Sequence, residues 1–322
     1  MNYVFDIVMV PLQIIILLFT LYYFFIGFCG MWRRKENKIL TPQKTFAVIV
    51  AAHNESAVIG QLLQNLKSLE YPKELYDIYV IADNCDDNTA EIAHDYGCIV
   101  CERHHPTKKS KGFAMEWMFE RLFKMDKKYD AVVVFDADNL VHPHFLLEMN
   151  NRLLKGDRII QGYLDAKNPY DTWISGTFAI AFWVIDHISH LAKTNIGLSA
   201  VLGGTGMCIA TDVLERHGWR ATCLTEDMEF TMKSLAEGIK TTWAHDAIVY
   251  DEKPLTFMQS WRQRKRWAQG QFDVAHRYIP KMLKEGVKRR DIRILDGCLY
   301  LLQPHFLMIS TFFIIISYVQ SA

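Results

Sequence analysis

Long apolar stretches stand at both ends of the chain, around a middle in which apolar and polar positions alternate with a regular period. Residues 7–32 carry no charged side chain, and about 20 apolar residues are enough to cross the hydrocarbon core of a bilayer. We therefore predict a transmembrane helix within residues 1–32. A cleaved signal peptide needs a basic start and a shorter apolar run, whereas the early charge here is Asp6. Residues 297–322 are also uncharged and predict a second transmembrane helix.

Short apolar runs in the middle of the chain alternate with stretches of helical periodicity. The apolar runs predict buried strands at 46–52, 78–82, 98–101 and 131–135. The periodic stretches predict helices near 56–69, 88–96 and 112–123. Strands that alternate with helices indicate an α/β fold, with a mainly parallel sheet and helices on both faces.

Two later stretches are amphipathic in a different way. Residues 173–192 carry an apolar stripe, but their uncharged core at 172–185 is too short to span a bilayer. Residues 257–296 interleave basic and aromatic side chains, a pattern typical of helices at a membrane surface. We predict that both stretches are interface helices that hold the middle of the chain against the bilayer.

The charges are balanced overall but are unevenly distributed. The chain has 36 Lys and Arg against 36 Asp and Glu, and all but Asp6 of these 72 residues fall within residues 33–296. That middle segment is therefore about 27% charged, which is ordinary for a water-exposed domain, so only the two ends are typical of a membrane protein. A net charge of zero also argues against a nucleic-acid partner, because such proteins usually carry a basic excess.

Basic residues flank both predicted transmembrane helices on the side of the middle segment. They lie at 33–35, Lys38, 288–290 and Arg293. The positive-inside rule then places the middle segment in the cytosol, and we expect the plasma membrane of a prokaryote. Because the sequence stops soon after the second helix, we expect further membrane helices from a longer protein, from another subunit or from a homo-oligomer. The seven cysteines are scattered through a protein that faces the cytosol, so they are not expected to form disulfides.

Polar and acidic residues follow three of the predicted strands. The first strand is followed by His53, Asn54 and Glu55, the second ends at Asp83, and the fourth leads into Asp136-Ala137-Asp138. Ligands of open α/β sheets bind at the carboxyl ends of the strands, so we expect these residues to converge on one site. A single such cluster is more often a turn or a helix cap. Carboxylates two residues apart, as at 136 and 138, suit a hard divalent cation.

Other candidate residues lie on helix starts and turns. The sequence has neither G-x-G-x-x-G nor the P-loop pattern, which disfavours a nicotinamide dehydrogenase and a P-loop nucleotidase. Lys111 precedes a helix where a phosphate could bind, although a solvated charged loop explains it equally well. Thr225 is expected to cap a helix that opens with Glu226 and Asp227, carboxylates that serve either the helix dipole or catalysis. Gly203–Gly206 is a tight turn or a point of close ligand approach.

Taken in order, these motifs resemble those of the membrane-embedded family 2 glycosyltransferases, such as the cellulose, hyaluronan and poly-N-acetylglucosamine synthases. The resemblance runs from about residue 46 to 272, and five motifs recur in sequence. They are Asn54-Glu55, Asp83, Asp136-x-Asp138, Thr225-Glu226-Asp227 and Gln263-x-x-Arg266-Trp267. The resemblance implies a GT-A fold for residues 33–256, and each motif alone would be weak.

The resemblance also implies a role for each motif residue. The donor nucleotide and its diphosphate would contact Asn54, Glu55, Asp83, Lys111, Asp136, Gln263, Arg264 and Arg266. Magnesium or manganese would be held by Asp136 and Asp138, and Asp227 would be the general base. The acceptor would lie against Gly204, Thr205, Glu226 and Trp267.

The activity implied by the resemblance is inverting transfer from a UDP-sugar. The leading hypothesis is a processive synthase that extends a β-linked polysaccharide acceptor at the cytosolic face and passes it across the membrane. The main alternative is non-processive transfer of one sugar to a lipid carrier. A non-catalytic membrane scaffold is a third hypothesis, which the intact set of carboxylates disfavours.

Overall fold

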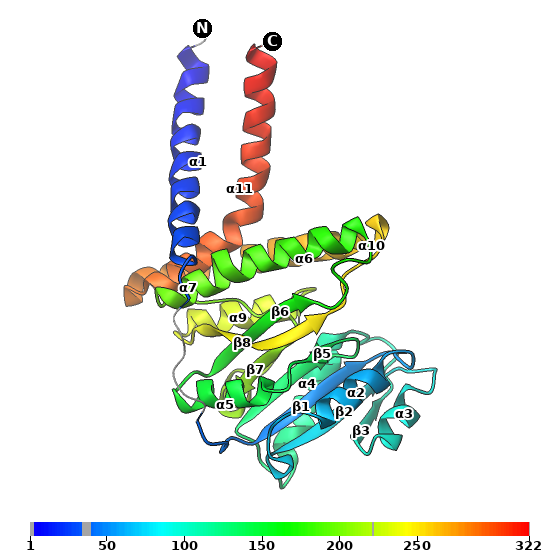
Figure 1. The fold of residues 1–322 in the computed structure, drawn as a ribbon. Helices are drawn as coiled ribbons and strands as arrows, with labels where there is room; N and C mark the ends of the chain where they lie inside the picture. Colours follow the sequence, from blue (N-terminus) through cyan, green and yellow to red (C-terminus); the bar gives the residue numbers. More distant parts are fainter. Residues whose placement is uncertain (1–2, 34–39, 221, 322) are drawn as a thin grey trace.

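A computed structural model describes residues 3–33, 40–220 and 222–321. Of the basic residues flanking the first predicted transmembrane helix, Arg34, Lys35 and Lys38 lie outside the described residues. Two long helices, α1 (Tyr3–Cys29) and α11 (Ile292–Ser321), extend side by side from the rest of the molecule, with both termini at their far ends (Figure 1). Both end segments are helical, as predicted, and each has a stretch long and apolar enough to cross a membrane.

The described residues between these helices form one eight-stranded sheet with the order β3-β2-β1-β4-β7-β6-β8-β5. The strands are β1 (Phe46–Ala52), β2 (Tyr76–Asp83), β3 (Ile99–Arg103), β4 (Ala131–Asp136), β5 (Leu140–Val141), β6 (Ile159–Ala166), β7 (Met207–Ala210) and β8 (Thr241–Asp251). The first four pair in parallel, as do β6 and β8, whereas β7 runs antiparallel to both of its neighbours and β5 to β8. The sheet is therefore mixed, with its predicted parallel part on the side of the first four strands.

Helices cover both faces of the sheet, as predicted. One face carries α2 (Ile59–Lys67), α3 (Thr89–Asp95) and α5 (Phe145–Leu154), and the other carries α4 (Lys111–Lys124), α8 (Thr211–His217) and α9 (Glu226–Ala236). A short 3-10 turn, η1 (Lys73–Leu75), leads into β2. Because helices bury both faces, the inner strands read as continuous apolar runs, and all but one residue of β1 are buried.

A third layer separates the sheet from the two long end helices. It contains α6 (Trp173–Ile185), the π-helical turn η2 (Asp186–Leu191), α7 (Ala192–Asn195) and the long α10 (Phe257–Arg289) (Figure 1). Residues 173–195 are long and apolar enough to cross a membrane, yet Asp186 and Lys193 within them are buried in the protein. The run from α6 to α7 lies across the end helices rather than along them (Figure 1), and its place at the membrane surface stays a prediction.

A buried polar contact joins this layer to the two end helices. Lys193 Nζ of α7 lies 3.0 Å from Asp296 Oδ2 of α11, and the Tyr22 hydroxyl of α1 donates to the other carboxylate oxygen. Lys193 and Asp296 are both almost fully buried. Separating Lys193 from Asp296 would leave an uncompensated buried charge. The pair therefore holds α11 against the third layer.

Candidate active site

The acidic turn after β4 is the centre of the candidate site. Asp136 is the last residue of β4, and it forms an ion pair with Lys111 at the start of α4. The same Lys111 ammonium donates to the carbonyl of Gly204 at 2.7 Å. The structure thus brings together the acidic motif, the predicted phosphate-facing lysine and the glycine turn, which lie far apart in the sequence.

Negative charge accumulates around the second carboxylate of this turn. Burial, followed by repulsion from Asp251 and Asp136, raises the pKa of Asp138 to about 7. Burial alone would lower the pKa of Lys111, but the Asp136 carboxylate outweighs burial, so the net shift of the Lys111 pKa is upward. The acidic turn therefore gathers more negative charge than the Lys111 ammonium neutralises.

This donor set fits a hard divalent cation. Asp136 and Asp138 offer carboxylate oxygens from one turn, and a cation between them would relieve the repulsion that raises the pKa of Asp138. Within the described parts of the chain, no three His, Cys, Asp or Glu residues are arranged to hold a metal ion. Two carboxylates of one turn suit a magnesium- or manganese-like site, which leaves positions for water and phosphate oxygens.

Asp227 lies in the first turn of α9, beside the glycine turn. Burial and the neighbouring Glu226 carboxylate raise the pKa of Asp227 to about 7. A Cβ atom on Gly204 would come within 3.2 Å of Asp227 Oδ2, and Gly204 has a φ of +83°, so glycine suits this position on both counts. Thr225 is the N-cap residue of α9, as predicted, but its side chain makes no capping hydrogen bond and packs against Gly270 of α10.

The first strand-end loop packs against the second. Asn54 adopts a left-handed conformation, with φ at 56°, and its side-chain oxygen accepts from the backbone N–H of Asp86 at 2.8 Å. Glu55 donates its backbone N–H to Thr89, and burial, with repulsion from Asp136, raises the pKa of its carboxyl. Both predicted nucleotide-binding residues therefore lie at the carboxyl edge of the sheet.

The Asp83 carboxylate already has a strong partner. It forms a buried ion pair with Arg103, at the end of β3, and that guanidinium also donates to the Lys108 carbonyl at 2.9 Å. The pair anchors the loop that leads to Lys111. Arg103 was missed in the sequence because a single arginine at the end of a strand belongs to no motif.

The Gln263–Trp267 segment of α10 divides its side chains between two surroundings. Gln263 and Arg266 line a cavity of about 490 Å³ together with Asp138. The Arg264 guanidinium instead lies 4.3 Å from the ring centroid of Phe178 on α6, and Trp267 packs against that same helix. Residues three apart on a helix share a face, which explains why positions 263 and 266 reach the cavity together.

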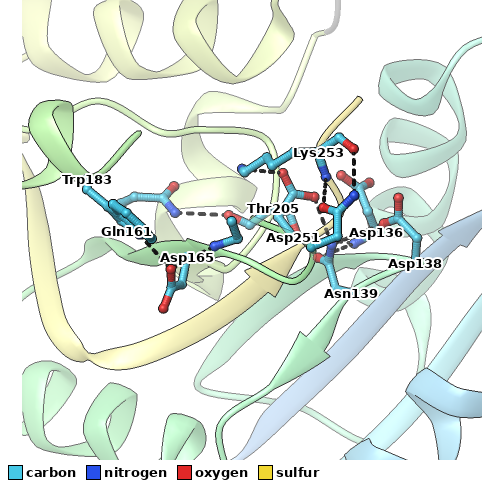
Figure 2. Close-up of polar contacts among 11 residues, drawn as sticks. Asp136, Asp138, Asn139, Gln161, Asp165, Trp183, Thr205, Asp251 and Lys253 are labelled. Carbon is cyan, nitrogen blue, oxygen red and sulfur yellow. Dashed lines mark hydrogen bonds and ion pairs between the residues drawn. The ribbon is translucent and has the colours of Figure 1, made fainter. Parts of the chain in front are cut away.

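Thr205 is buried within the glycine turn. Its hydroxyl accepts from the backbone N–H of Asp136 at 3.1 Å and donates to Asn139. As placed, this side chain holds the acidic turn rather than facing an acceptor. Asn139, Asp251 and Lys253 also belong to this polar cluster and were not predicted (Figure 2).

Comparison with known proteins gives consistent relatives. A family model described as "Glycosyltransferase like family 2" matches residues 42–270. A probable glycosyltransferase, YdaM, of Bacillus subtilis is 27% identical, with 86% of this chain and 65% of that protein aligned. A beta-monoglucosyldiacylglycerol synthase of Nostoc is 26% identical, with coverages of 80% and 55%. A poly-beta-1,6-N-acetyl-D-glucosamine synthase of Staphylococcus epidermidis is 24% identical, with coverages of 79% and 61%. The chain spans about half to two thirds of the length of these relatives.

Solved structures share the fold. The mannosyltransferase PcManGT from Pyrobaculum calidifontis, in complex with GDP-Man and Mn²⁺, has a TM-score of 0.72 at 16% identity, covering 98% of this chain and 87% of that one. TarS 1-349 of S. aureus, in complex with UDP-GlcNAc, has a TM-score of 0.56 at 16% identity, with coverages of 80% and 72%. At these identities the likeness concerns the fold, which is of the GT-A type, as expected.

Proposed function

The chain belongs to glycosyltransferase family 2, and from that premise we propose that it transfers a sugar from a UDP-linked donor to an acceptor hydroxyl beside Asp227, with inversion of the anomeric centre. The observation that carries the proposal is the arrangement around the glycine turn. Lys111 contacts both Asp136 and the Gly204 carbonyl, and Gly204 in turn lies against Asp227. A donor diphosphate on the acidic side and an acceptor on the Asp227 side would meet across this turn.

The donor side would stabilise the leaving group. A nucleoside diphosphate gains negative charge as the glycosidic bond breaks, so cations aimed at it lower the barrier. Lys111 stands at the acidic turn, and Arg266 lines the adjacent cavity with Gln263 and Asp138. Mg²⁺ or Mn²⁺, held by Asp136 and Asp138, would act as a Lewis acid on the diphosphate. The solved complexes of PcManGT and of the Mycobacterium tuberculosis glucosyl-3-phosphoglycerate synthase contain Mn²⁺, which supports this assignment.

The acceptor side would supply the base. A carboxylate whose pKa is about 7 is close to the ideal for accepting a proton near neutral pH. As the acceptor oxygen attacks the anomeric carbon, Asp227 would take its proton, and the bond to the diphosphate would break on the opposite face. A hydroxyl is a weak nucleophile, so loss of this base would slow the transfer strongly.

We favour a growing β-linked polysaccharide as the acceptor, in a processive reaction that passes the product across the membrane. The motif at 263–267 resembles one that the polysaccharide synthases carry, and its Gln263 and Arg266 line the cavity beside Asp138. Transfer of one sugar to a lipid is the second candidate. It is favoured by the exposed apolar residues of the layer above the site, among them Trp173, Ile180, Phe257 and Trp261. The similar curated relatives include both a polysaccharide synthase and a lipid glycosyltransferase.

The experiment that tests the function uses membranes that contain the full protein and a panel of UDP- and GDP-sugars. Release of nucleoside diphosphate from one donor identifies the sugar, and the product is then sized. A ladder of long polymer supports the synthase, whereas a single-sugar lipid supports the second candidate. Failure of every donor to release nucleoside diphosphate beyond that of empty membranes would contradict the proposal.

A further inference from the structure

Asn139 is the hub of the polar cluster beneath the acidic turn. It lies directly after Asp138 and is 1% exposed. Its side-chain oxygen accepts from the backbone N–H of Asp136 at 3.2 Å and from the Thr205 hydroxyl. Its amide nitrogen donates to Asp138 Oδ1 and to Asp251 Oδ1, each at 3.1 Å (Figure 2). One side chain thus contacts both residues of the proposed metal-binding pair.

The chemistry of these partners requires an amide. Two neighbours of Asn139 are donors, a backbone N–H and a hydroxyl, and two are carboxylate oxygens. The primary amide offers two donors and two acceptor lone pairs, and only one orientation satisfies all four contacts. An aspartate of the same shape would turn an oxygen toward two carboxylates, and an alanine would leave all four groups without this partner.

A second set of contacts extends from the hub toward the membrane-surface layer. Asp251 accepts from Lys253 Nζ at 2.9 Å, and Lys253 is 2% exposed. The Lys253 ammonium lies 3.6 Å from the ring centroid of Phe182 on α6, and that ring also packs against Trp267 of α10. Asn139 therefore contacts the acidic turn directly, and α6 supports the same cluster through the contact of Phe182 with Lys253.

We propose that Asn139 is a positioning residue that sets the Asp136 and Asp138 oxygens for a divalent cation and the donor diphosphate, with Asp251 and Lys253 as its brace. The inference rests on the proposed function, because it assigns Asn139 to the same metal and diphosphate site. Groups that orient metal ligands typically change metal affinity by about 10–100-fold when they are removed. Asn139 is the residue in this cluster that contacts both Asp136 and Asp138 directly.

The test measures Mn²⁺ binding directly. Free Mn²⁺ is followed by its paramagnetic resonance signal during titration of the detergent-purified full chain in saturating UDP. We expect Asn139→Ala and Asn139→Asp to weaken Mn²⁺ binding about 10–100-fold. We expect Asp251→Ala, which removes one acceptor of the hub, to weaken it less, and this milder variant serves if those at 139 do not fold.

Asn150 provides a matched control. It is fully buried and accepts from the backbone N–H groups of Gln43 and Lys44, at 3.0 Å each, and from the Tyr71 hydroxyl at 3.2 Å. Asn150→Ala is expected to lower the unfolding temperature as much as Asn139→Ala while leaving Mn²⁺ binding unchanged. Unchanged Mn²⁺ binding in folded Asn139 and Asp251 variants, or equal weakening in the Asn150 variant, would overturn the inference. Absence of UDP-dependent Mn²⁺ binding in the wild-type protein would instead overturn the proposed function, and the inference with it.

Discussion

Aspartates flank both ends of strand β4, and the surroundings of the carboxylates at the two ends shift their pKa values in opposite directions. Asp130, just before the strand, accepts from Lys44 at 3.0 Å and from the Thr45 N–H and hydroxyl at 2.9 and 3.0 Å. Despite burial, which acts the other way, the hydrogen bonds from Thr45 and Lys44 lower the pKa of Asp130. Beyond the other end of the strand, burial and like charges raise the pKa of Asp138 to about 7.

Burial raises the pKa at both ends, and it is the largest cause of the shift at Asp138. The partners decide the direction of the shift. The protein supplies hydrogen-bond donors to Asp130, whereas Asp138 faces the further carboxylates of Asp251, Asp136 and Glu252. The Asp130 carboxylate is thus satisfied within the fold, whereas under the proposed function the charge around Asp138 would be balanced by a cation that arrives with the substrate.

The largest expected effect separates Asp227 from Asp130. Asp227→Asn should lower the turnover number for sugar transfer roughly 10²–10⁴-fold, because it removes the base, while UDP binding is kept. Asp130→Asn should leave turnover unchanged and lower the free energy of unfolding by about 1 kcal/mol, because a neutral amide weakens the interactions with Lys44 and Thr45. Rates of nucleoside diphosphate release and urea unfolding curves measure the two. Near-normal turnover in Asp227→Asn would remove that residue from the role of base.

Removal of divalent metal should act at one end of the strand only. A chelator is expected to stop sugar transfer, and added Mn²⁺ or Mg²⁺ should restore it, because the diphosphate then regains its Lewis acid. The unfolding temperature without nucleotide should change little, since the Asp130 end needs no cation. Transfer that persists in the chelator would take Asp136 and Asp138 out of the metal role.

A smaller effect is expected from a methyl group placed behind Asp227. A Cβ on Gly270 would lie 2.4 Å from Thr225 Oγ1, so Gly270→Ala must shift the start of α9. We expect transfer to fall about tenfold, because small displacements of catalytic groups are costly. Gly286→Ala in the same helix meets the end of the Leu295 side chain at 2.7 Å and is the matched control. Equal losses of transfer in both variants would indicate a general effect on α10 packing.

The smallest effect concerns pH. Since Asp227 must be deprotonated to act, kcat/KM in saturating metal should rise with pH and level off above about 7. Glu226→Gln removes a neighbouring negative charge and should move this rise to lower pH. A rate that is flat between pH 5 and 8 would contradict the assignment of Asp227 as the base.

The stability of the fold should depend on pH in opposite ways at the two ends of β4. The stabilisation from Asp130, whose pKa is lowered, is present above its unfolded pKa of about 4 and is lost as the pH falls below it, whereas the raised pKa of Asp138 favours folding toward low pH.

Much of this molecule is predictable from its sequence because strongly periodic apolar runs dominate their segments. Strands β1 to β4 and the helix after Ser110 follow directly from such runs, and the acidic residues at the ends of these strands converge because parallel strands share a carboxyl edge. The antiparallel insertion of β7 was not predictable, because the short run Met207–Ala210 carries no sign of its direction.

The polar cluster under the site was also beyond the sequence. Asn139 meets Asp251, and through it Lys253, by a tertiary contact, and each of the three reads as an ordinary polar residue at a turn or strand end. The pairing of Asp83 with Arg103 is of the same kind. The motifs predict which residues carry the chemistry, whereas partners such as Thr205 and Arg103 reach those residues from other parts of the chain and belong to none of the five motifs.

The central claim is that the carboxyl edge of the sheet binds the donor, and binding of UDP to the purified protein tests it most directly. Calorimetric titration would compare wild type, Asp136→Asn and Asp130→Asn, each with and without Mn²⁺. We predict Mn²⁺-dependent binding with similar affinity in wild type and Asp130→Asn, and a loss of about tenfold or more in Asp136→Asn. Equal affinity in all three proteins, or binding that needs no metal, would contradict the account.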